Sequence, residues 1–167
     1  MSNFSYSKNF KGIAEVFLRM PKYYKPLLGF FENVMIGESA LSKAEREIIA
    51  KHVSNINGCD FCVHAHEETA SALDSESNID DISDQLQALL NFAEKLTRTP
   101  ARVTIKDIDK LKDKGIAEQT IEDTINVVSL LNYLNRLVDA FGVQGDPDYF
   151  KMVGKSLADN GYAALIP

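Results

Sequence analysis

The chain has 167 residues, of which 45% are hydrophobic and 25% are charged, and its formal net charge is −6. The lysines and arginines of this acidic chain are scattered, which excludes a protein that binds the phosphate backbone of nucleic acids. No apolar run is long enough to cross a bilayer, and the first ten residues lack the basic and apolar stretches of a secretory signal, so we expect a cytoplasmic protein with no membrane partner.

Two helices are predicted in the first part of the chain. The first covers residues 8–20, where apolar side chains recur at helical spacing, namely Phe10, Ile13, Val16 and Phe17. Pro21 ends this helix. The second helix runs to about Val34 or Met35, with Pro26 near its start, where proline is tolerated.

A third helix has the clearest start signal in the sequence. Ser42 and Glu45 form a capping box, in which each side chain bonds to the backbone amide of the other residue. Asn57-Gly58 ends the helix, because these residues tolerate the left-handed conformation. One face is an apolar stripe that consists of Ile48, Ile49, His52, Val53 and Ile56. The opposite face has small residues around Glu47, and these allow a neighbouring element to cover that carboxylate.

Helices are also predicted over most of the remaining chain. The fourth begins at Cys59 or Asp60 and runs to about Leu73, and the segment from residue 74 to residue 84 is a polar loop. Further helices are expected over residues 84–97, 104–112, 118–141 and 148–157. No run alternates with a period of two. The sequence therefore predicts a single all-α domain over residues 1–167, with about seven or eight helices.

The only two cysteines of the chain, Cys59 and Cys62, lie three residues apart. In a reducing compartment, such a pair is more often catalytic or metal-binding than structural. At about 100° per residue, one face of the fourth helix carries Cys59, Cys62 and His66, whereas His64 points to the other side. The helix N-terminus, the imidazole and the second thiol all favour a thiolate, so the sequence predicts a redox-active pair.

The spacing Glu47-x11-Cys59-x2-Cys62-x3-His66 resembles the core motif of the alkyl hydroperoxidase D branch of the carboxymuconolactone decarboxylase family. This motif region covers residues 40–75, approximately. Residues 111–116 and 132–136 are similar to the second half of the longer, peroxidase-related members. One position differs, because the best-known members carry a histidine directly before the second cysteine, where this chain has Phe61.

The resemblance implies a thiol peroxidase or disulfide oxidoreductase. In it, Cys62 would attack a hydroperoxide, Cys59 would form the disulfide that resolves the product, and Glu47 and His66 would relay protons. A dithiol carrier, either a lipoyl protein or a thioredoxin-like protein, would restore the thiols. The resemblance also implies a homo-oligomer, a trimer or a hexamer, and no bound cofactor.

Other interpretations of the same residues stay open. The cysteines could sense redox state or hold a metal ion with His66, although the second ligand pair that is usual in zinc modules is missing. A cysteine-independent decarboxylase is a further alternative. Three polar residues of the predicted helix over 118–141 could hydrogen-bond across a helix interface, line the site or form an ordinary polar helix face, namely Asn132, Asn135 and Arg136. His52 could be a core or interface histidine or a ligand. The same holds for the aromatic residues Tyr23, Tyr24, Phe30 and Phe31, which could line a route to the thiols or pack in the core.

Overall fold

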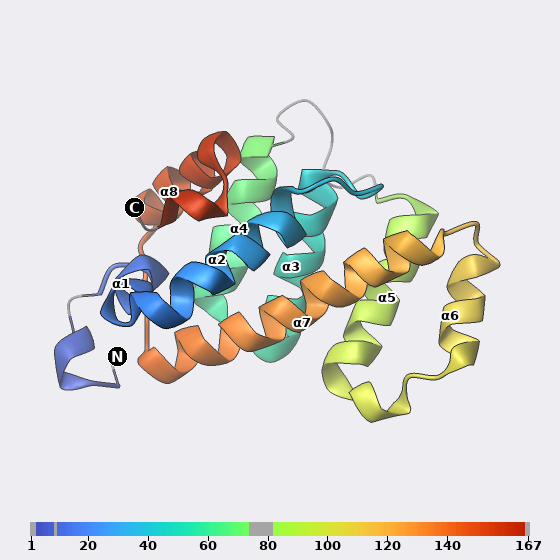
Figure 1. Ribbon diagram of the computed structural model, residues 1–167, viewed down its shortest axis with the longest axis horizontal. Helices are drawn as coiled ribbons and strands as arrows, with labels where there is room; N and C mark the ends of the chain where they lie inside the picture. Colours follow the sequence, from blue (N-terminus) through green and yellow to red (C-terminus); the bar gives the residue numbers. More distant parts are fainter. Residues whose placement is uncertain (1–2, 9, 74–81, 166–167) are drawn as a thin grey trace.

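The computed structural model describes residues 3–8, 10–73 and 82–165, and every regular element among them is helical (Figure 1). Most of the loop expected over residues 74–84 lies outside the described residues. The α-helices are α1 (Ile13–Arg19), α2 (Pro21–Ile36), α3 (Lys43–Asn57), α4 (Asp60–Leu73), α5 (Asp84–Arg98), α6 (Ile105–Lys112), α7 (Glu118–Phe141) and α8 (Pro147–Asn160). The short 3-10 helices are η1 (Ser5–Ser7), η2 (Pro100–Arg102) and η3 (Tyr162–Leu165). The predicted all-α fold is confirmed.

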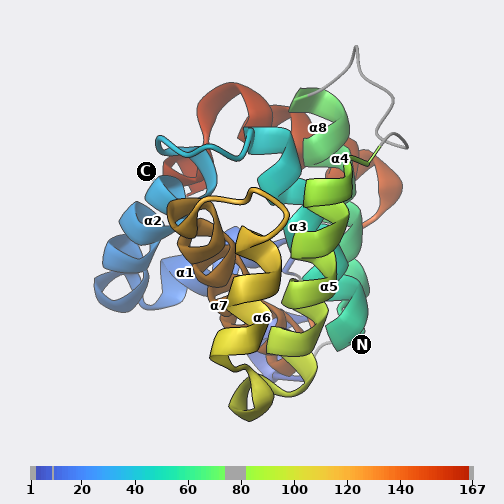
Figure 2. The same ribbon diagram turned by 90° about the vertical axis from the view of Figure 1, so that its right-hand side faces the viewer.

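Helix α3 lies at the centre of the fold, in contact with α4, α5 and α7. Helix α7 runs along the molecule from the end that carries α5 and α6 to the N-terminal segment (Figures 1 and 2). There the Asn3 side chain donates to the backbone oxygens of Asp139 and Ala140. None of the helices in the described ranges is long and apolar enough to cross a membrane.

The turn between α3 and α4 follows the sequence signals closely. Ser42 Oγ accepts from the Glu45 amide at 3.1 Å, and Glu45 Oε2 accepts from the Ser42 amide at 2.8 Å, which completes the predicted capping box. Gly58 has a φ of 73°, a conformation that costs a glycine little. The Cys59 amide then bonds to the Ser54 carbonyl, and α4 starts at the next residue, so that Cys59 directly precedes the helix and Cys62 lies in its first turn.

The N-terminal helices differ from the prediction in two places. Helix α1 starts at Ile13 rather than at residue 8, because extended Gly12 is its N-cap. Helix α2 starts at Pro21, so Pro26 lies inside it and not near its start. Proline has no amide to bond to the carbonyl four residues earlier, but both Pro26 and Lys22 are exposed, and water can bond to that carbonyl.

Helix α8 lies directly on the backbone of α4. A Cβ atom at Gly154 would lie 2.7 Å from the carbonyl carbon of Glu68 and 2.9 Å from the amide nitrogen of Thr69. Only a residue without a side chain fits at this crossing. Gly154 therefore sets the distance between the two helices.

The chain turns back toward the core after α8. Gly161 has a φ of 72°, and a Cβ atom there would collide with the Glu32 carboxylate. Glu32 Oε2 accepts from the amides of Tyr162 and Ala163 at 2.6 Å and 2.9 Å. This contact ties η3 to α2, and it directs Tyr162 inward, where its ring stacks on Phe31 at 4.0 Å between centroids.

Candidate active site

The two thiols lie together at the start of α4. Both cysteines are free, and the Cys59 thiol donates to the Cys62 sulfur at 2.9 Å. Cys59 is fully buried, whereas Cys62 is 5% exposed. The thiols are thus close enough to form a disulfide with only local rearrangement.

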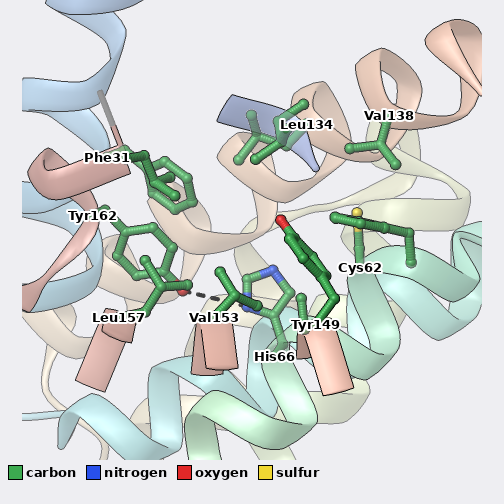
Figure 3. Close-up of a pocket in the computed structure, with 13 residues that line it drawn as sticks. Phe31, Cys62, His66, Leu134, Val138, Tyr149, Val153, Leu157 and Tyr162 are labelled. Carbon is green, nitrogen blue, oxygen red and sulfur yellow. Dashed lines mark hydrogen bonds between the residues drawn. The ribbon is translucent and has the colours of Figure 1, made fainter. Parts of the chain in front are cut away.

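Only one of the two cysteines lines the cavity beside them. This cavity has a volume of about 50 Å³. Since a water molecule needs roughly 10–15 Å³ on this measure, the cavity has room for a few water-sized groups. Cys62 and His66 line it, together with the apolar or aromatic residues Ile13, Phe31, Phe61, Ala65, Leu134, Val138, Tyr149, Val153, Leu157, Tyr162 and Leu165 (Figure 3). A ligand there meets Cys62 first.

Three buried side chains from different elements form a hydrogen-bonded cluster beside this cavity, which two of them line. His66 Nδ1 lies 2.6 Å from Glu47 Oε2, and the Tyr162 hydroxyl donates to Glu47 Oε1 at 2.6 Å. The same hydroxyl lies 3.5 Å from His66 Nδ1 (Figure 3). Glu47 is fully buried, and His66 and Tyr162 are 6% and 2% exposed. The neighbouring element that we expected over Glu47 therefore exists, and it consists of α4 and η3.

The surroundings shift the pKa values of the two thiols in opposite directions. The hydrogen bond from Cys59 lowers the pKa of the Cys62 thiol, and the nearby His66 charge and Asn135 act in the same direction, against the effect of burial. The same hydrogen bond, followed by burial, raises the pKa of the Cys59 thiol. Of the two thiols, Cys62 is the one whose surroundings favour the thiolate.

The electrostatics of the histidine follow from its carboxylate partner. Burial alone lowers the pKa of His66, but the charge and hydrogen bond of Glu47 outweigh it and raise this pKa above its ordinary value. Burial, reinforced by Glu47, raises the pKa of Tyr162. His66 can therefore hold a proton near neutral pH next to Cys62, while Tyr162 stays a hydrogen-bond donor.

A second, neutral cluster joins α3 to α7. The Asn57 side chain donates to Asn135 Oδ1 at 2.8 Å and to Asn132 Oδ1 at 3.2 Å. Asn135 Nδ2 donates to Ser54 Oγ at 3.0 Å, and Arg136 donates to Asn132 Oδ1 at 2.9 Å. Asn132 and Asn135 thus hydrogen-bond across a helix interface, which was one of the alternatives left open, whereas Arg136 is exposed and bonds within α7.

The other histidines lie away from the thiols. His64 is exposed, lies 3.7 Å from Glu67 and packs beside Phe150, as expected for a surface residue. His52 is half-buried, and burial lowers its pKa. Its Nε2 atom has no hydrogen-bond partner within the described ranges.

Some of the aromatic side chains near the site line the cavity, and others do not. Phe31 and Phe61 line the cavity, and Phe61 packs against the rings of Tyr149 and Phe150 at centroid distances of 5.8 Å and 5.3 Å. The remaining aromatic residues of α2 do not line the cavity: Tyr24 is buried in the core, while Tyr23 and Phe30 are exposed.

Two tyrosines of the site were not predicted from the sequence. Tyr149 of α8 and Tyr162 of η3 both line the cavity. Neither lies in the Glu47–His66 motif, and Tyr162 follows the last predicted helix without any periodic pattern. The one local signal is Gly161, which marks a turn that directs the next residue.

The site has no further ligands for a metal ion. Across the described part of the chain, no group of three or more His, Cys, Asp or Glu side chains could hold one. Cys59, Cys62 and His66, which we considered as a metal site, therefore do not form such a group.

Comparison with known sequences identifies a domain and a relative. Residues 21–97 match the carboxymuconolactone decarboxylase family. The chain is 24% identical over 115 residues to the uncharacterized protein YdfG of Bacillus subtilis (strain 168), and this match covers 63% of the chain and 78% of YdfG.

Solved structures with the same fold come from three bacteria. An uncharacterized peroxidase-related protein from Silicibacter sp. TM1040 superposes with a TM-score of 0.75 at 28% identity, over 83% of this chain and 78% of that one. An uncharacterized peroxidase-related protein from Ralstonia eutropha JMP134, described as an alkylhydroperoxidase AhpD core, has a TM-score of 0.76 at 22% identity, over 84% and 78%. A protein of unknown function from Agrobacterium tumefaciens has a TM-score of 0.64 at 19% identity, over 87% and 99%. The last two show the fold alone.

Proposed function

Since residues 21–97 form a carboxymuconolactone decarboxylase family domain, and the chain resembles the alkyl hydroperoxidase D branch of that family, we propose that it is a thiol-dependent peroxidase or disulfide oxidoreductase. Its redox centre would be Cys59 and Cys62, and its substrate a hydroperoxide. Glu47 and His66 would move the protons.

One observation supports this proposal more than any other. Two free thiols lie 2.9 Å apart, but only the sulfur with the lowered pKa lines a cavity, and it shares that cavity with a histidine bound to a buried glutamate. A nucleophile, a proton carrier that is oriented by a third group, and a second thiol are the parts that two-cysteine peroxide reduction needs. A pair of cysteines that only pack in a core needs none of them.

The first step of the proposed reaction consumes the peroxide. The Cys62 thiolate attacks the outer oxygen of the hydroperoxide, so that an S–O bond forms while the O–O bond breaks. Cys62 becomes a sulfenic acid, which is a two-electron oxidation, and the peroxide is reduced to an alkoxide. The His66 imidazolium gives its proton to the alkoxide, which leaves as the alcohol.

The second step closes the disulfide. The Cys59 sulfur attacks Cys62, an S–S bond forms, and the hydroxyl group of the sulfenic acid leaves as water with the proton of the Cys59 thiol. An external dithiol then reduces the disulfide by exchange and is itself oxidised. We propose a lipoyl or thioredoxin-like protein as this reductant, and a trimer or hexamer as the working assembly.

The departure at Phe61 shapes the proposal. No imidazole stands between the cysteines, so the proton has to travel through His66 and Glu47. Phe61 adds an apolar wall to the cavity instead. A hydroperoxide with a small apolar group fits this lining better than a charged one.

The deciding experiment is a thiol count with intact mass on the reduced protein, before and after one equivalent of ethyl hydroperoxide near neutral pH. We expect both thiols to disappear and the mass to fall by two hydrogens. Survival of both thiols contradicts the peroxidase proposal. The double variant Cys59→Ser, Cys62→Ser is the control, because activity that persists without either thiol points to cysteine-independent, decarboxylase-type chemistry.

A further inference from the structure

Both oxygens of the Glu47 carboxylate are occupied by protein donors. Oε2 is held by His66, and Oε1 accepts from the Tyr162 hydroxyl at 2.6 Å. In a fully buried carboxylate, the loss of either donor would leave an acceptor without a partner, which is costly. Tyr162 is therefore the group that completes the hydrogen bonding of Glu47.

The position of Tyr162 is fixed by contacts that lie outside the thiol motif. Glu32 of α2 accepts from the amides of Tyr162 and Ala163, and Gly161 supplies the turn. The phenol ring stacks on Phe31 and is 2% exposed. The family match ends at residue 97, so the segment that carries Tyr162 lies beyond it.

We infer that Tyr162 is a positioning residue of the redox site, whose hydroxyl holds Glu47 and thereby orients His66 toward Cys62 and the cavity. This inference rests on the proposed function for its role in turnover. With both of its oxygens held, the Glu47 carboxylate keeps its hydrogen bond to His66 Nδ1 and so fixes the orientation of the imidazole ring. The opposite ring nitrogen is then left for proton transfer in the cavity that Cys62 lines.

The cavity offers a matched control for this role. Tyr149 is a half-buried tyrosine that also lines the cavity, and its partial burial raises its pKa to about 12. Its ring packs against Phe61 of α4 and Phe150 of α8. Removal of the Tyr149 hydroxyl changes the polarity of the same cavity but leaves the two bonds of Glu47 in place.

The first readout is the titration of His66, which needs no peroxide. The chain has only three histidines, so isotope labelling of histidine followed by NMR resolves each ring, with His52 and His64 as internal references. The groups that face the His66 imidazole are Glu47 of α3, Cys62 of α4 and Tyr162 of η3, with Arg46 next to Glu47 and Glu32 next to Tyr162.

The sign of the expected shift follows from the direction of the hydroxyl dipole. The positive end of the Tyr162 hydroxyl points at Glu47, so it stabilises the more negative state of the Glu47–His66 pair. Without it, His66 releases its proton less readily. In Tyr162→Phe we expect the His66 midpoint to rise by on the order of one pH unit, since one hydrogen bond to a charged group is lost. His52 and His64 should not move, and Tyr149→Phe should leave all three histidines unchanged.

The second readout is turnover with ethyl hydroperoxide. Tyr162→Phe keeps the ring, so KM should stay the same while kcat falls by roughly tenfold. An unchanged His66 midpoint overturns the inference. So does a shift of all three histidines, because the hydroxyl would then hold the fold and not the pair. If the wild-type protein consumes no peroxide, the proposed function fails, but the titration still decides the role of Tyr162.

Discussion

Helix α3 meets two buried polar clusters, one near its first turn and one near its last. The first contains Glu47, His66 and Tyr162, and the second contains Ser54, Asn57 and Asn135. Both are closed by hydrogen bonds between side chains. The first can change its charge and lines the cavity through His66 and Tyr162, whereas the second consists of neutral groups and lines no part of that cavity.

The difference between the two clusters indicates how the fold divides the work around the thiols. A buried charge is tolerated only with full hydrogen bonding, and both oxygens of the Glu47 carboxylate have a protein partner. A neutral amide costs less to bury and suits a place that only has to hold two helices in register. Cys62 responds to both clusters, because His66 and Asn135 both lower its pKa.

The largest effect is expected at the thiols themselves. Cys62→Ser should abolish peroxide turnover while the fold persists, because the attacking sulfur is gone. Cys59→Ser should consume one equivalent of peroxide and stop, since the sulfenic acid of Cys62 then has no partner thiol. Stopped-flow peroxide consumption and intact mass measure both. Multiple turnovers in Cys62→Ser would sink the assignment of roles.

The next largest effect is expected in the charged cluster. Glu47→Gln should lower turnover by roughly 100-fold, the scale of a lost acid–base group. It removes the group that outweighs burial and raises the pKa of His66, so this pKa should fall and His66 should be neutral at pH 7. Rate profiles against pH and the NMR titration of His66 measure this change.

The stability of the fold should depend on pH through the same pair of Glu47 and His66. A raised pKa of His66 contributes stability that is complete below about pH 6.5, the ordinary histidine value, and is lost as the pH rises through the folded-state pKa. Denaturant titrations should show this loss in the wild type but not in Glu47→Gln. Glu45→Gln, in the first turn of the same helix, is the control, because glutamine also serves at that position of a capping box.

A substitution in the neutral cluster should affect the free energy of unfolding more than the turnover rate. Asn135→Leu removes the acceptor of Asn57 and the donor to Ser54, which should cost about 1–3 kcal/mol in the free energy of unfolding. The pKa of Cys62 should rise because Asn135 helps to lower it, so alkylation by iodoacetamide should shift to higher pH. Turnover should fall only a few-fold, on the order of one weakened hydrogen bond. A loss as large as that in Glu47→Gln would remove the distinction between the clusters.

The smallest effect is expected at the rim of the neutral cluster. Asn132 is half-buried, and Arg136 and Asn57 both donate to it. Asn132→Ala should cost at most about 1 kcal/mol of stability, since Asn57 keeps its bond to Asn135. The His66 midpoint and the alkylation profile of Cys62 should match the wild type. A shift in either would show that the rim also acts on the thiols.

Local signals explain why so much of the helix pattern could be predicted. The predicted bounds of α7 agree with the structure, and the capping box of Ser42 and the left-handed Gly58 set the ends of α3. These features depend on residues close in sequence. The face shared by Cys59, Cys62 and His66 follows from helix periodicity in the same way, and the structure does bring these side chains together.

The rest of the site depends on contacts between distant residues. Periodicity alone places Glu47 on a polar face, yet it is fully buried because α4 and η3 cover it. Tyr162 reaches Glu47 across 115 residues of sequence, through a turn that Glu32 holds from 130 residues away. Contacts between residues so far apart produce no periodic pattern in the sequence. Only packing shows that the C-terminal turn belongs to the site.

The width of the cavity depends on Gly154, because a residue without a side chain lets α8 approach α4 closely. Helix α8 carries Tyr149, Val153 and Leu157 over Cys62, and Gly154 lets this helix rest on the backbone of α4. Even one methyl group at that crossing would wedge the two helices apart and lift the aromatic and aliphatic cover away from the sulfur. Position 154, on the face of α8 that packs on α4, therefore determines the width of the cavity beside the Cys62 sulfur.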